Sequence, residues 1–210
     1  ITLLKNIEFE KVQRQEKIQR YNDSLQEFMV QSYSSQKNFE DILCTLLKMA
    51  SVTAQIDRVS YWNYQPEKIK CLNLYEKTTN KFEHNFTLKR ADYPVYFENI
   101  EKELQIVAEN VLKNQVTQEL CKNYTEKYQI KSLLDTPVFI DGRLHGILCF
   151  ETTEKHINWD NEDINFARSL SDLIVIALES QRRLDVERRL AYKSELLSAI
   201  VICTEKFLQS

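Results

Sequence analysis

Apolar residues recur at heptad spacing near both ends of the chain, and they alternate over shorter runs in its middle. Residues 1–32 predict one long helix, whose a and d positions hold Leu4, Ile7, Ile18, Tyr21, Leu25 and Phe28. Lys11 and Arg14 interrupt this seam. A coiled coil is the first interpretation; for the last two turns, packing on the helix's own domain explains the pattern equally well.

The last segment, residues 161 to about 207, predicts a second long helix because it contains no Gly or Pro. Its first turns would bury Ile164, Ala167, Leu170, Ile174 and Ala177 against a sheet. Farther on, heptad spacing resumes at Val186, Leu190, Leu197, Ile200 and Phe207. Asp160 is the expected N-cap, with Asp163 near the N3 position. We expect this helix to extend several turns past its domain.

Between the long helices, the pattern changes from helical to alternating. Residues 38–53 form an apolar helical stripe, and residues 58–64 and 69–75 predict a strand hairpin rich in β-branched and aromatic residues. The remaining expected elements are a helix at 93–103, a short strand at 104–108 and an amphipathic helix at 114–128.

Both glycines of the chain lie in one stretch, residues 134–151. Asp141 and Gly142 between two apolar runs predict a hairpin with a type I′ turn, which needs positive φ at both positions. With that turn, Phe139 faces Leu144 and Val138 faces His145. Both faces are mostly apolar, so the hairpin should be central in its sheet. Gly146 then marks a close approach of the backbone or the floor of a small pocket.

Composition narrows the function. Two glycines in 210 residues exclude a P-loop, a dinucleotide fingerprint and a kinase ATP lid, which need several glycines at fixed spacing. A net charge of −3 without a basic stripe argues against nucleic-acid binding. Five separated cysteines suit reduced thiols better than disulfides or zinc, so we expect a cytoplasmic location. No apolar run is long enough to span a membrane, and a start at Ile1 suggests a piece of a longer protein.

The order of elements and several short motifs resemble a GAF domain of the subset found in bacterial multidomain sensors. These motifs are DRVSYW (57–62), LNLY (72–75), DYPVYF (92–97), SLLDTPV (132–138), GRLHGILCFE (142–151), Trp159 and parts of 162–179. The resemblance implies an α+β fold with a mainly antiparallel sheet of five or six strands and helices on both faces. It also implies domains at 1–35 (dimerisation helix), 36–181 (GAF) and 182–210 (signalling helix).

Departures from the family patterns limit the choice of cofactor. Cys121 precedes Lys122 where bilin-binding members have His after the chromophore cysteine, and residues 80–84 lack the cyclic-nucleotide spacing. The stretch after Cys149 reads Phe150-Glu151-Thr152 instead of the subset's frequent His-Glu-His. We therefore expect no bilin, nucleotide or metal site, and the identity of any cofactor stays open.

Candidate site residues follow partly from the resemblance. Tyr93, Tyr96 and Phe97 resemble the family's lid segment, while His145 and Cys149 alternate into the inner set of the central hairpin. Each of these five residues could equally be a packing residue of the hydrophobic core without a role in binding. For the dimer helices, the candidates are Ile18, Tyr21, Leu25, Phe28, Val186, Leu190 and Leu197.

The resulting hypothesis is a non-enzymatic input module of a bacterial signalling protein, such as a histidine kinase or diguanylate cyclase. It would bind a small ligand or relay a conformational change through a parallel helical homodimer, with an output domain or a second GAF domain following. Two alternatives remain: a thiol-dependent redox enzyme using Cys149, and a scaffold that binds no ligand.

Overall fold

The computed structural model describes residues 2–33, 38–102 and 105–208, which divide into two units, 1–175 and 176–210. The helices are α1 (Thr2–Tyr33), α2 (Phe39–Ala54), α3 (Pro94–Lys102) and α4 (Asn161–Leu208). Two short helical turns are η1 (Gln118–Leu120) and η2 (Cys121–Thr125), the second a π-helical turn. The strands are β1 (Arg58–Gln65), β2 (Lys68–Glu76), β3 (Lys81–Glu83), β4 (Thr87–Lys89), β5 (Ile106–Ala108), β6 (Ser132–Ile140) and β7 (Arg143–Thr152).

The strands form one antiparallel sheet of seven strands. Their order is β3-β2-β1-β7-β6-β5, and β4 also pairs with β2. The β6–β7 hairpin is central, as its apolar faces predict, because it pairs with β1 on one side and β5 on the other. The predicted α+β fold is confirmed, with two three-residue strands, β3 and β4, that the sequence pattern did not predict.

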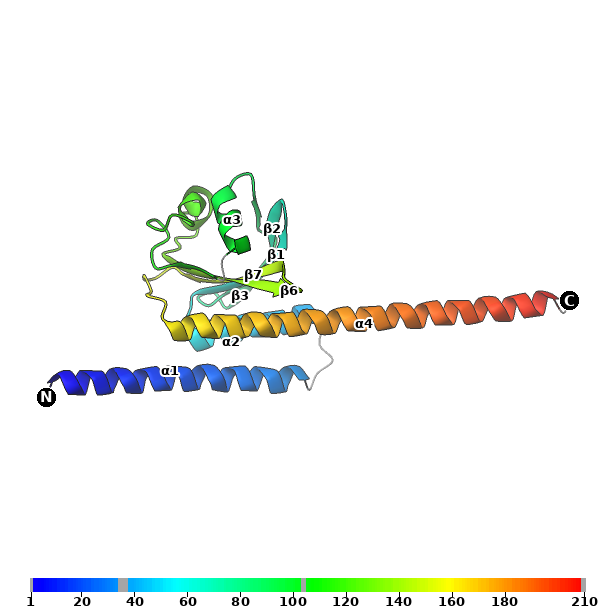
Figure 1. Ribbon diagram of the computed structural model, residues 1–210, viewed down its shortest axis with the longest axis horizontal. Helices are drawn as coiled ribbons and strands as arrows, with labels where there is room; N and C mark the ends of the chain where they lie inside the picture. The colour runs from blue at the N-terminus through cyan, green and yellow to red at the C-terminus, as the bar shows by residue number, and fades with distance from the viewer. Residues whose placement is uncertain (1, 34–37, 103–104, 209–210) are drawn as a thin grey trace. The chain divides into compact units, whose positions relative to one another are not determined.

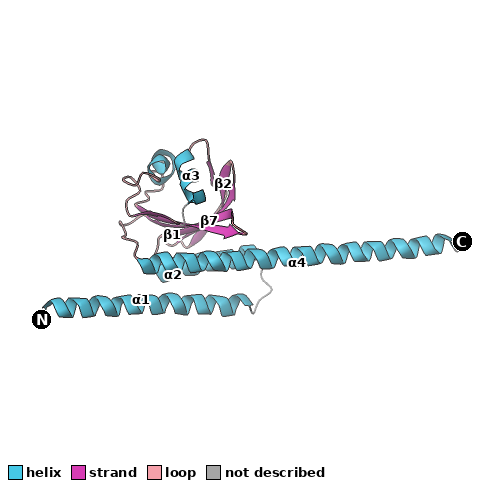
Figure 2. Cartoon of the chain, in the orientation of Figure 1, coloured by secondary structure: helices cyan, strands magenta, loops and turns pink. Residues whose placement is uncertain are grey.

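Helices cover both faces of the sheet (Figure 1). In the first unit, α3, η1 and η2 lie on one face, and α2 with the first turns of α4 lies on the other (Figure 2). The second helix predicted at 38–53 is α2, whose N-cap Asn38 accepts a hydrogen bond from the Asp41 amide at 2.9 Å. The sheet is therefore buried on both faces, which explains its nearly continuous apolar strands.

Helix α1 packs on its own domain along its second half. Tyr21 stacks on Phe166 of α4 at 4.1 Å between ring centroids, and Arg20 donates to the Thr53 carbonyl of α2. Tyr21 and Phe28 are both 4% exposed. The last turns of α1 were open to two interpretations, a coiled coil or packing on the same domain. For Tyr21 and Phe28 the second is correct, because both side chains are already buried within this chain.

The turn of the central hairpin has the predicted geometry, but its register differs by one residue. Asp141 and Gly142 have φ of 50° and 71°, as a type I′ turn requires. Phe139 faces Leu144 as expected, but Val138 pairs with Gly146 rather than with His145, because the register shifts between Val138 and Phe139. This bulge leaves His145 without a cross-strand partner and turns it outward.

Gly146 marks a close approach to a side chain. A Cβ built on Gly146 would lie 2.2 Å from the Tyr61 hydroxyl, and Tyr61 packs edge-on against Phe39 of α2. Since Tyr61 lies on the α2 face, Gly146 is not the floor of a pocket on the α3 face. The close approach predicted for this glycine is confirmed, and the pocket-floor alternative is wrong.

Replacing Gly146 with alanine should destabilise the fold by about 1–3 kcal/mol, because the new methyl group overpacks a buried tyrosine. Urea denaturation measures this loss. In a Tyr61→Leu background the cost of Gly146→Ala should fall, since the overlapping ring atoms are gone. The control is Gly142→Ala, whose cost comes from backbone strain at φ 71° and should be the same in both backgrounds. Equal costs of Gly146→Ala in both backgrounds would contradict the overlap.

The segment 114–128 departs most from its predicted form. Instead of one amphipathic α-helix, it contains turns followed by η1 and η2. Asn114 caps the start of this segment by accepting hydrogen bonds from the amides of Val116 and Thr117, and the Thr117 hydroxyl donates to the Val111 carbonyl. These side-chain bonds to the backbone compete with a regular helical ladder.

The described part of the second unit, residues 176–208, consists of the later turns of α4. Large apolar side chains on this segment are exposed: Leu184, Val186, Leu190, Leu196, Leu197, Ile200 and Val201. Among the described residues, no helix has the length and apolar character needed to cross a membrane.

Candidate functional site

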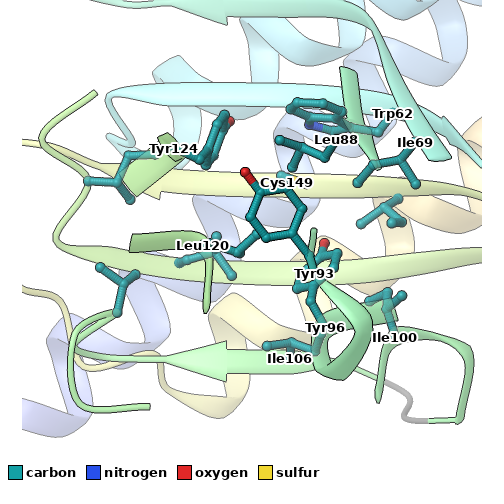
Figure 3. Packing of buried hydrophobic residues seen from close by; sticks show 14 of the residues in the cluster. Trp62, Ile69, Leu88, Tyr93, Tyr96, Ile100, Ile106, Leu120, Tyr124 and Cys149 are labelled. Atoms are coloured by element: carbon teal, nitrogen blue, oxygen red, sulfur yellow. The ribbon is translucent and has the colours of Figure 1, made fainter. Parts of the chain in front are cut away.

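A small cavity lies on the α3 face of the sheet, inside a cluster of buried apolar residues (Figure 3). Its volume is about 10 Å³, enough for about one water molecule. The lining residues are Trp62, Ile69, Leu88, Tyr96, Leu120, Tyr124, Leu133, Asp135, Cys149 and Glu151. The sheet provides the floor through β1, β2, β6 and β7, while α3, η1 and η2 form the cover. The cavity is small, apolar at its walls and acidic at its floor.

Asp135 is the main polar group on this floor. It lies on β6 opposite Cys149 of β7 and is 1% exposed. One carboxylate oxygen, Oδ2, accepts a hydrogen bond of 2.6 Å from the Tyr96 hydroxyl of α3. The other, Oδ1, receives no hydrogen bond of normal geometry from the described residues; its polar neighbour is the thiol of Cys149, a weak donor. One oxygen of this buried carboxylate therefore has at most a weak hydrogen bond from the described residues.

Burial sets the protonation state of Asp135. Removal from water raises the pKa of its carboxyl group from 3.8 to about 7, and the negative charge of Glu151 adds to this shift. The hydrogen-bond donors Cys149 and Tyr96 offset part of it. Near neutral pH, Asp135 thus exchanges between a neutral acid and a buried carboxylate.

Glu151, the second acid of the cavity, is neutralised by a buried ion pair. Arg58 Nε donates to Glu151 Oε2 at 3.0 Å, and the side chains are 4% and 1% exposed. The Arg58 guanidinium also lies 4.8 Å from the ring centroid of Tyr128. Burial acts to lower the pKa of Arg58, but the charge of Glu151 raises it further, so the guanidinium stays charged. Arg58 also contacts Glu76 at 3.5 Å, and no described residue forms an ion pair with Asp135.

The cover is attached to the sheet at few polar points. The Tyr96 hydroxyl donates to Asp135 of the sheet, whereas the Tyr96 amide donates to the Glu119 carboxylate of η1 at 2.5 Å and joins two parts of the cover. At the rim, Glu101 of α3 pairs with Arg90 and accepts a hydrogen bond from Tyr64 of β1. A displacement of α3 therefore has to break the bond between Tyr96 and the very carboxylate that forms the cavity floor.

The structure brings together four of the five predicted pocket residues. Tyr93, Tyr96, Phe97 and Cys149 are buried in the cavity cluster, although only Tyr96 and Cys149 line the cavity itself. His145 is exposed, so its placement in the pocket was wrong; the bulge between Val138 and Phe139 turns it to solvent.

Sequence reasoning missed Asp135, Glu151 and Arg58. The available signal was a lone acid inside the apolar run of residues 132–140, because a charge at a doubly covered strand position must have a partner or a function. A second signal was Arg58 at the start of an apolar strand. Neither indicates its partner, which lies 93 residues away in the case of Arg58 and Glu151.

The buried thiols do not have the properties of a redox site. Burial, with the charge of Asp135, raises the pKa of Cys149 well above its usual value, and burial raises that of Cys71 as well. A nucleophilic cysteine needs the opposite shift. Among the described residues, no three His, Cys, Asp or Glu side chains are arranged to hold a metal ion.

Strand β6 connects the cavity floor to α4. Because side chains alternate along a strand, Thr136 points to the face opposite Asp135. Gln105 donates to the Thr136 hydroxyl at 3.1 Å and to the Ile164 carbonyl of α4 at 3.2 Å. One residue further, the Pro137 carbonyl accepts a hydrogen bond from Ser171 of α4 at 3.0 Å. A movement of β6 at Asp135 would thus be transmitted directly to the first turns of α4.

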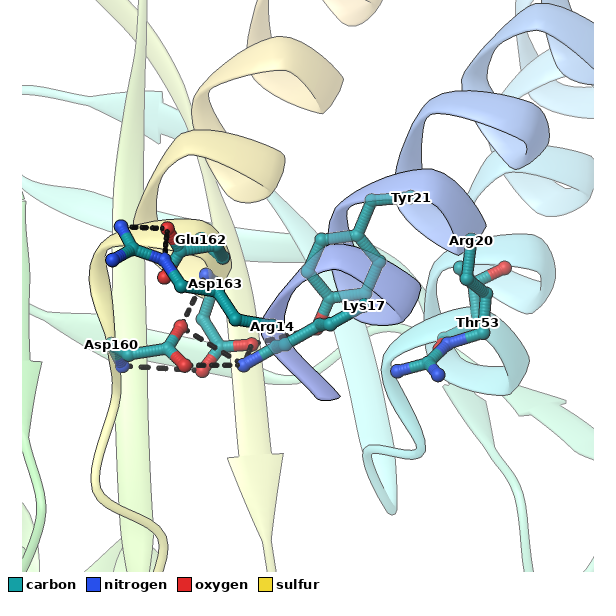
Figure 4. A network of polar contacts seen from close by, with 8 residues as sticks. All are labelled: Arg14, Lys17, Arg20, Tyr21, Thr53, Asp160, Glu162 and Asp163. Atoms are coloured by element: carbon teal, nitrogen blue, oxygen red, sulfur yellow. Dashed lines mark hydrogen bonds and ion pairs between the residues drawn. The ribbon is translucent and has the colours of Figure 1, made fainter. Parts of the chain in front are cut away.

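The start of α4 is also bound to α1 through a polar network (Figure 4). Asp160 and Asp163 form the predicted cap, each accepting a hydrogen bond from the other's amide. Lys17 of α1 contacts both carboxylates at 2.7–2.8 Å, and the Tyr21 hydroxyl donates to Asp163 at 2.6 Å. Partial burial works against it, but the Lys17 ammonium lowers the pKa of Asp160. Helices α1 and α4 thus meet where the β6 contacts also reach α4.

The predicted dimer residues fall into two groups. Tyr21 and Phe28 are buried in this chain, so they are corrected to intramolecular packing residues, and Leu25 is half-buried. Ile18, Val186, Leu190 and Leu197 are exposed and stay candidates for a dimer surface.

Comparison with known proteins identifies the family. The family model described as GAF domain matches residues 38–178, which is most of the chain. The chain belongs to the GAF domain family. No curated protein matches it significantly.

Solved structures agree on the fold of this GAF domain. The GAF domain of a phosphoenolpyruvate-protein phosphotransferase from Coxiella burnetii has a TM-score of 0.64 at 15% identity, covering 80% of this chain and 98% of its own. A phycocyanobilin-bound GAF domain from a cyanobacterial phytochrome gives 0.64 at 14%, covering 77% and 94%. Free methionine-R-sulfoxide reductase from Neisseria meningitidis, in complex with its substrate, gives 0.60 at 13%, covering 78% and 91%. At such identities the likeness shows the fold alone.

Proposed function

We propose that this GAF domain is a sensory module that binds a small ligand between the sheet and the α3 cover. The observation that carries the proposal is the buried carboxylate of Asp135 on the floor of a small cavity, with one oxygen that lacks a hydrogen bond of normal geometry from the described residues. A protein that used this region only as core would gain stability from an apolar residue there. Some structures of similar fold hold a bilin or a substrate, as their descriptions state.

Ligand binding would reach the helices along β6. A ligand that engages Asp135 competes with the Tyr96 hydroxyl for the carboxylate and shifts β6 relative to α3. The bonds of Thr136 and Pro137 carry this shift to α4, and the Lys17 network carries it to α1. Two helices that leave the domain would then change their mutual position, which is a usual output of a switching module.

The proposal also includes the oligomeric state of the module and the kind of protein in which it acts. Exposed apolar residues on α1 and on the second unit, among them Ile18, Val186 and Leu190, suit a homodimer of parallel helices. We place the module in the cytoplasm, without catalytic activity of its own, before the output domain of a bacterial signalling protein such as a histidine kinase.

Native mass spectrometry of the freshly purified chain, followed by denaturing mass spectrometry, tests this function. We expect a dimer that carries a non-covalent small molecule, and we expect that molecule to be lost on denaturation. Cys149→Leu adds volume beside Asp135 and should abolish the adduct while leaving the dimer intact. The matched control is Cys44→Leu on α2, outside the cavity, which should retain it.

Three results would overturn parts of the proposal. A dimer without any adduct, and without stabilisation by any compound in a metabolite screen, would favour a scaffold or a relay driven by the helices. A monomer at high concentration would remove the dimer but not the ligand site. An adduct retained in Cys149→Leu would place the ligand elsewhere.

A further inference from the structure

We propose that the ligand is a small organic cation, a protonated or methylated amine, held by Asp135 and by the rings of Trp62, Tyr96 and Tyr124. This inference rests on the proposed function and specifies the chemistry of the same site. Three features of the cavity support it: its charge, its aromatic walls and its size.

The charge of the cavity is negative and unbalanced. Its lining holds two carboxyl groups, Asp135 and Glu151, and none of the ten lining residues is Lys or Arg. Glu151 already has Arg58 at 3.0 Å, so a ligand cannot take this carboxylate without breaking a buried ion pair. Asp135 Oδ1 lacks a hydrogen bond of normal geometry, and no described Lys or Arg forms an ion pair with this carboxylate. An anionic ligand would meet an uncompensated like charge, whereas an ammonium group would supply the missing positive charge.

The walls of the cavity favour the same ligand class. Trp62 and Tyr124 stand edge to face at 5.8 Å between ring centroids, and Tyr96 closes the space from α3 (Figure 3). Aromatic faces around a desolvated site attract cations, and most strongly those with alkyl groups on nitrogen. A carboxylate beneath such walls offers both a negative charge and apolar contact. A sugar has no positive charge to match the carboxylate, and a metal ion has no alkyl groups to contact the rings.

The small volume of the cavity limits the size of the ligand. A volume of about 10 Å³ admits nothing larger than water unless the cover moves. The Tyr96 hydroxyl holds the cover on Oδ2, so an ammonium group that binds Oδ1 enters beside this bond or replaces it. The site therefore fits a compact head group with a short alkyl chain directed along Leu88, Leu120 and Leu133.

Protonation of Asp135 should compete with the cation. The groups that act on it are Tyr96 of α3 and Cys149 and Glu151 of β7; Tyr124 of η2 lines the same cavity, and Cys71 of β2 interacts with Cys149. Burial raises the pKa of the tyrosines Tyr96 and Tyr124 and of the thiols, so these stay neutral below pH 8. With the pKa of Asp135 at about 7, affinity for a cation should fall about tenfold between pH 8 and pH 6.

Isothermal titration calorimetry and thermal shift at constant chloride concentration test the inference on the full chain. The probes are methylammonium, trimethylammonium, tetramethylammonium and butylammonium chlorides, with tert-butanol and 1-butanol as neutral isosteres and sodium chloride as the ionic control. We expect at least one ammonium probe to bind, and its affinity to drop about tenfold or more in Asp135→Asn. The matched control, Asp172→Asn at an exposed site on α4, should bind as the original chain does. Tyr124→Phe keeps the ring and should keep most of the affinity.

The outcomes separate the two proposals. The proposal of a cationic ligand is wrong if the adduct found by native mass spectrometry is neutral or anionic, or if Asp135→Asn binds ammonium probes with unchanged affinity. The proposed sensory function is not contradicted by either result. If neither an adduct nor any probe is bound, both proposals fail. A cation affinity independent of pH between 6 and 8 would also contradict the role given to Asp135.

Discussion

Replacing Asp135 with asparagine should make the folded protein more stable at pH 8, by up to about 4 kcal/mol, and leave its stability at pH 4 almost unchanged. The carboxyl pKa is 3.8 in the unfolded chain and about 7 in the folded one. Between these values the folded state holds a proton that the unfolded state has released, so this group lowers stability as pH rises through that window. A difference of about 3 units corresponds to about 4 kcal/mol. Asparagine cannot ionise, and its side-chain oxygen can still accept the Tyr96 hydrogen bond.

Urea denaturation of both chains at pH 4, 5, 6, 7 and 8 measures this difference. Asp172→Asn, the same change at an exposed position, should show no comparable trend. A difference between Asp135→Asn and the original chain that stays constant with pH would mean that the buried carboxyl group titrates normally. A variant that gains stability but loses the proposed ligand would show that the acid is kept for binding at a cost in stability.

Replacing Arg58 with methionine should destabilise the protein by about 3–5 kcal/mol at neutral pH, because it leaves the Glu151 carboxylate buried without a counter-charge. Methionine fills most of the space of the arginine stem, so the loss reports the charge rather than a large cavity. Urea denaturation at pH 7 measures it, and near-ultraviolet circular dichroism checks that the native packing is kept.

The double variant Arg58→Met/Glu151→Leu is the matched control. It removes both charges and should recover most of the stability lost in Arg58→Met, because an apolar pair needs no desolvation of ions. A loss below about 1 kcal/mol in the single variant would indicate that the pair is solvated rather than buried. A double variant as unstable as the single one would assign the loss to packing.

The sequence determined the parts of this protein whose physical causes are local. Heptad and strand periodicity placed α1, α2, α4 and the β1–β2 hairpin, because the apolar pattern of a segment follows its own repeat. The positive φ values at Asp141 and Gly142 and the Asp160–Asp163 cap followed in the same way from residues adjacent in the chain. The motifs of the central strands also sufficed to indicate the GAF family and the aromatic segment around Tyr96.

Only the tertiary structure decided the site and the packing of its surroundings. Asp135, Tyr96, Glu151 and Arg58 come from four elements, and their distances in sequence hold no periodic signal. One bulge moved His145 from the predicted pocket to solvent, and the burial of Tyr21 against Phe166 depended on a helix 145 positions away. Charge pairing, burial and cavity shape arise from contacts between distant segments, so a pattern that describes one segment at a time determines the elements and leaves open what they enclose.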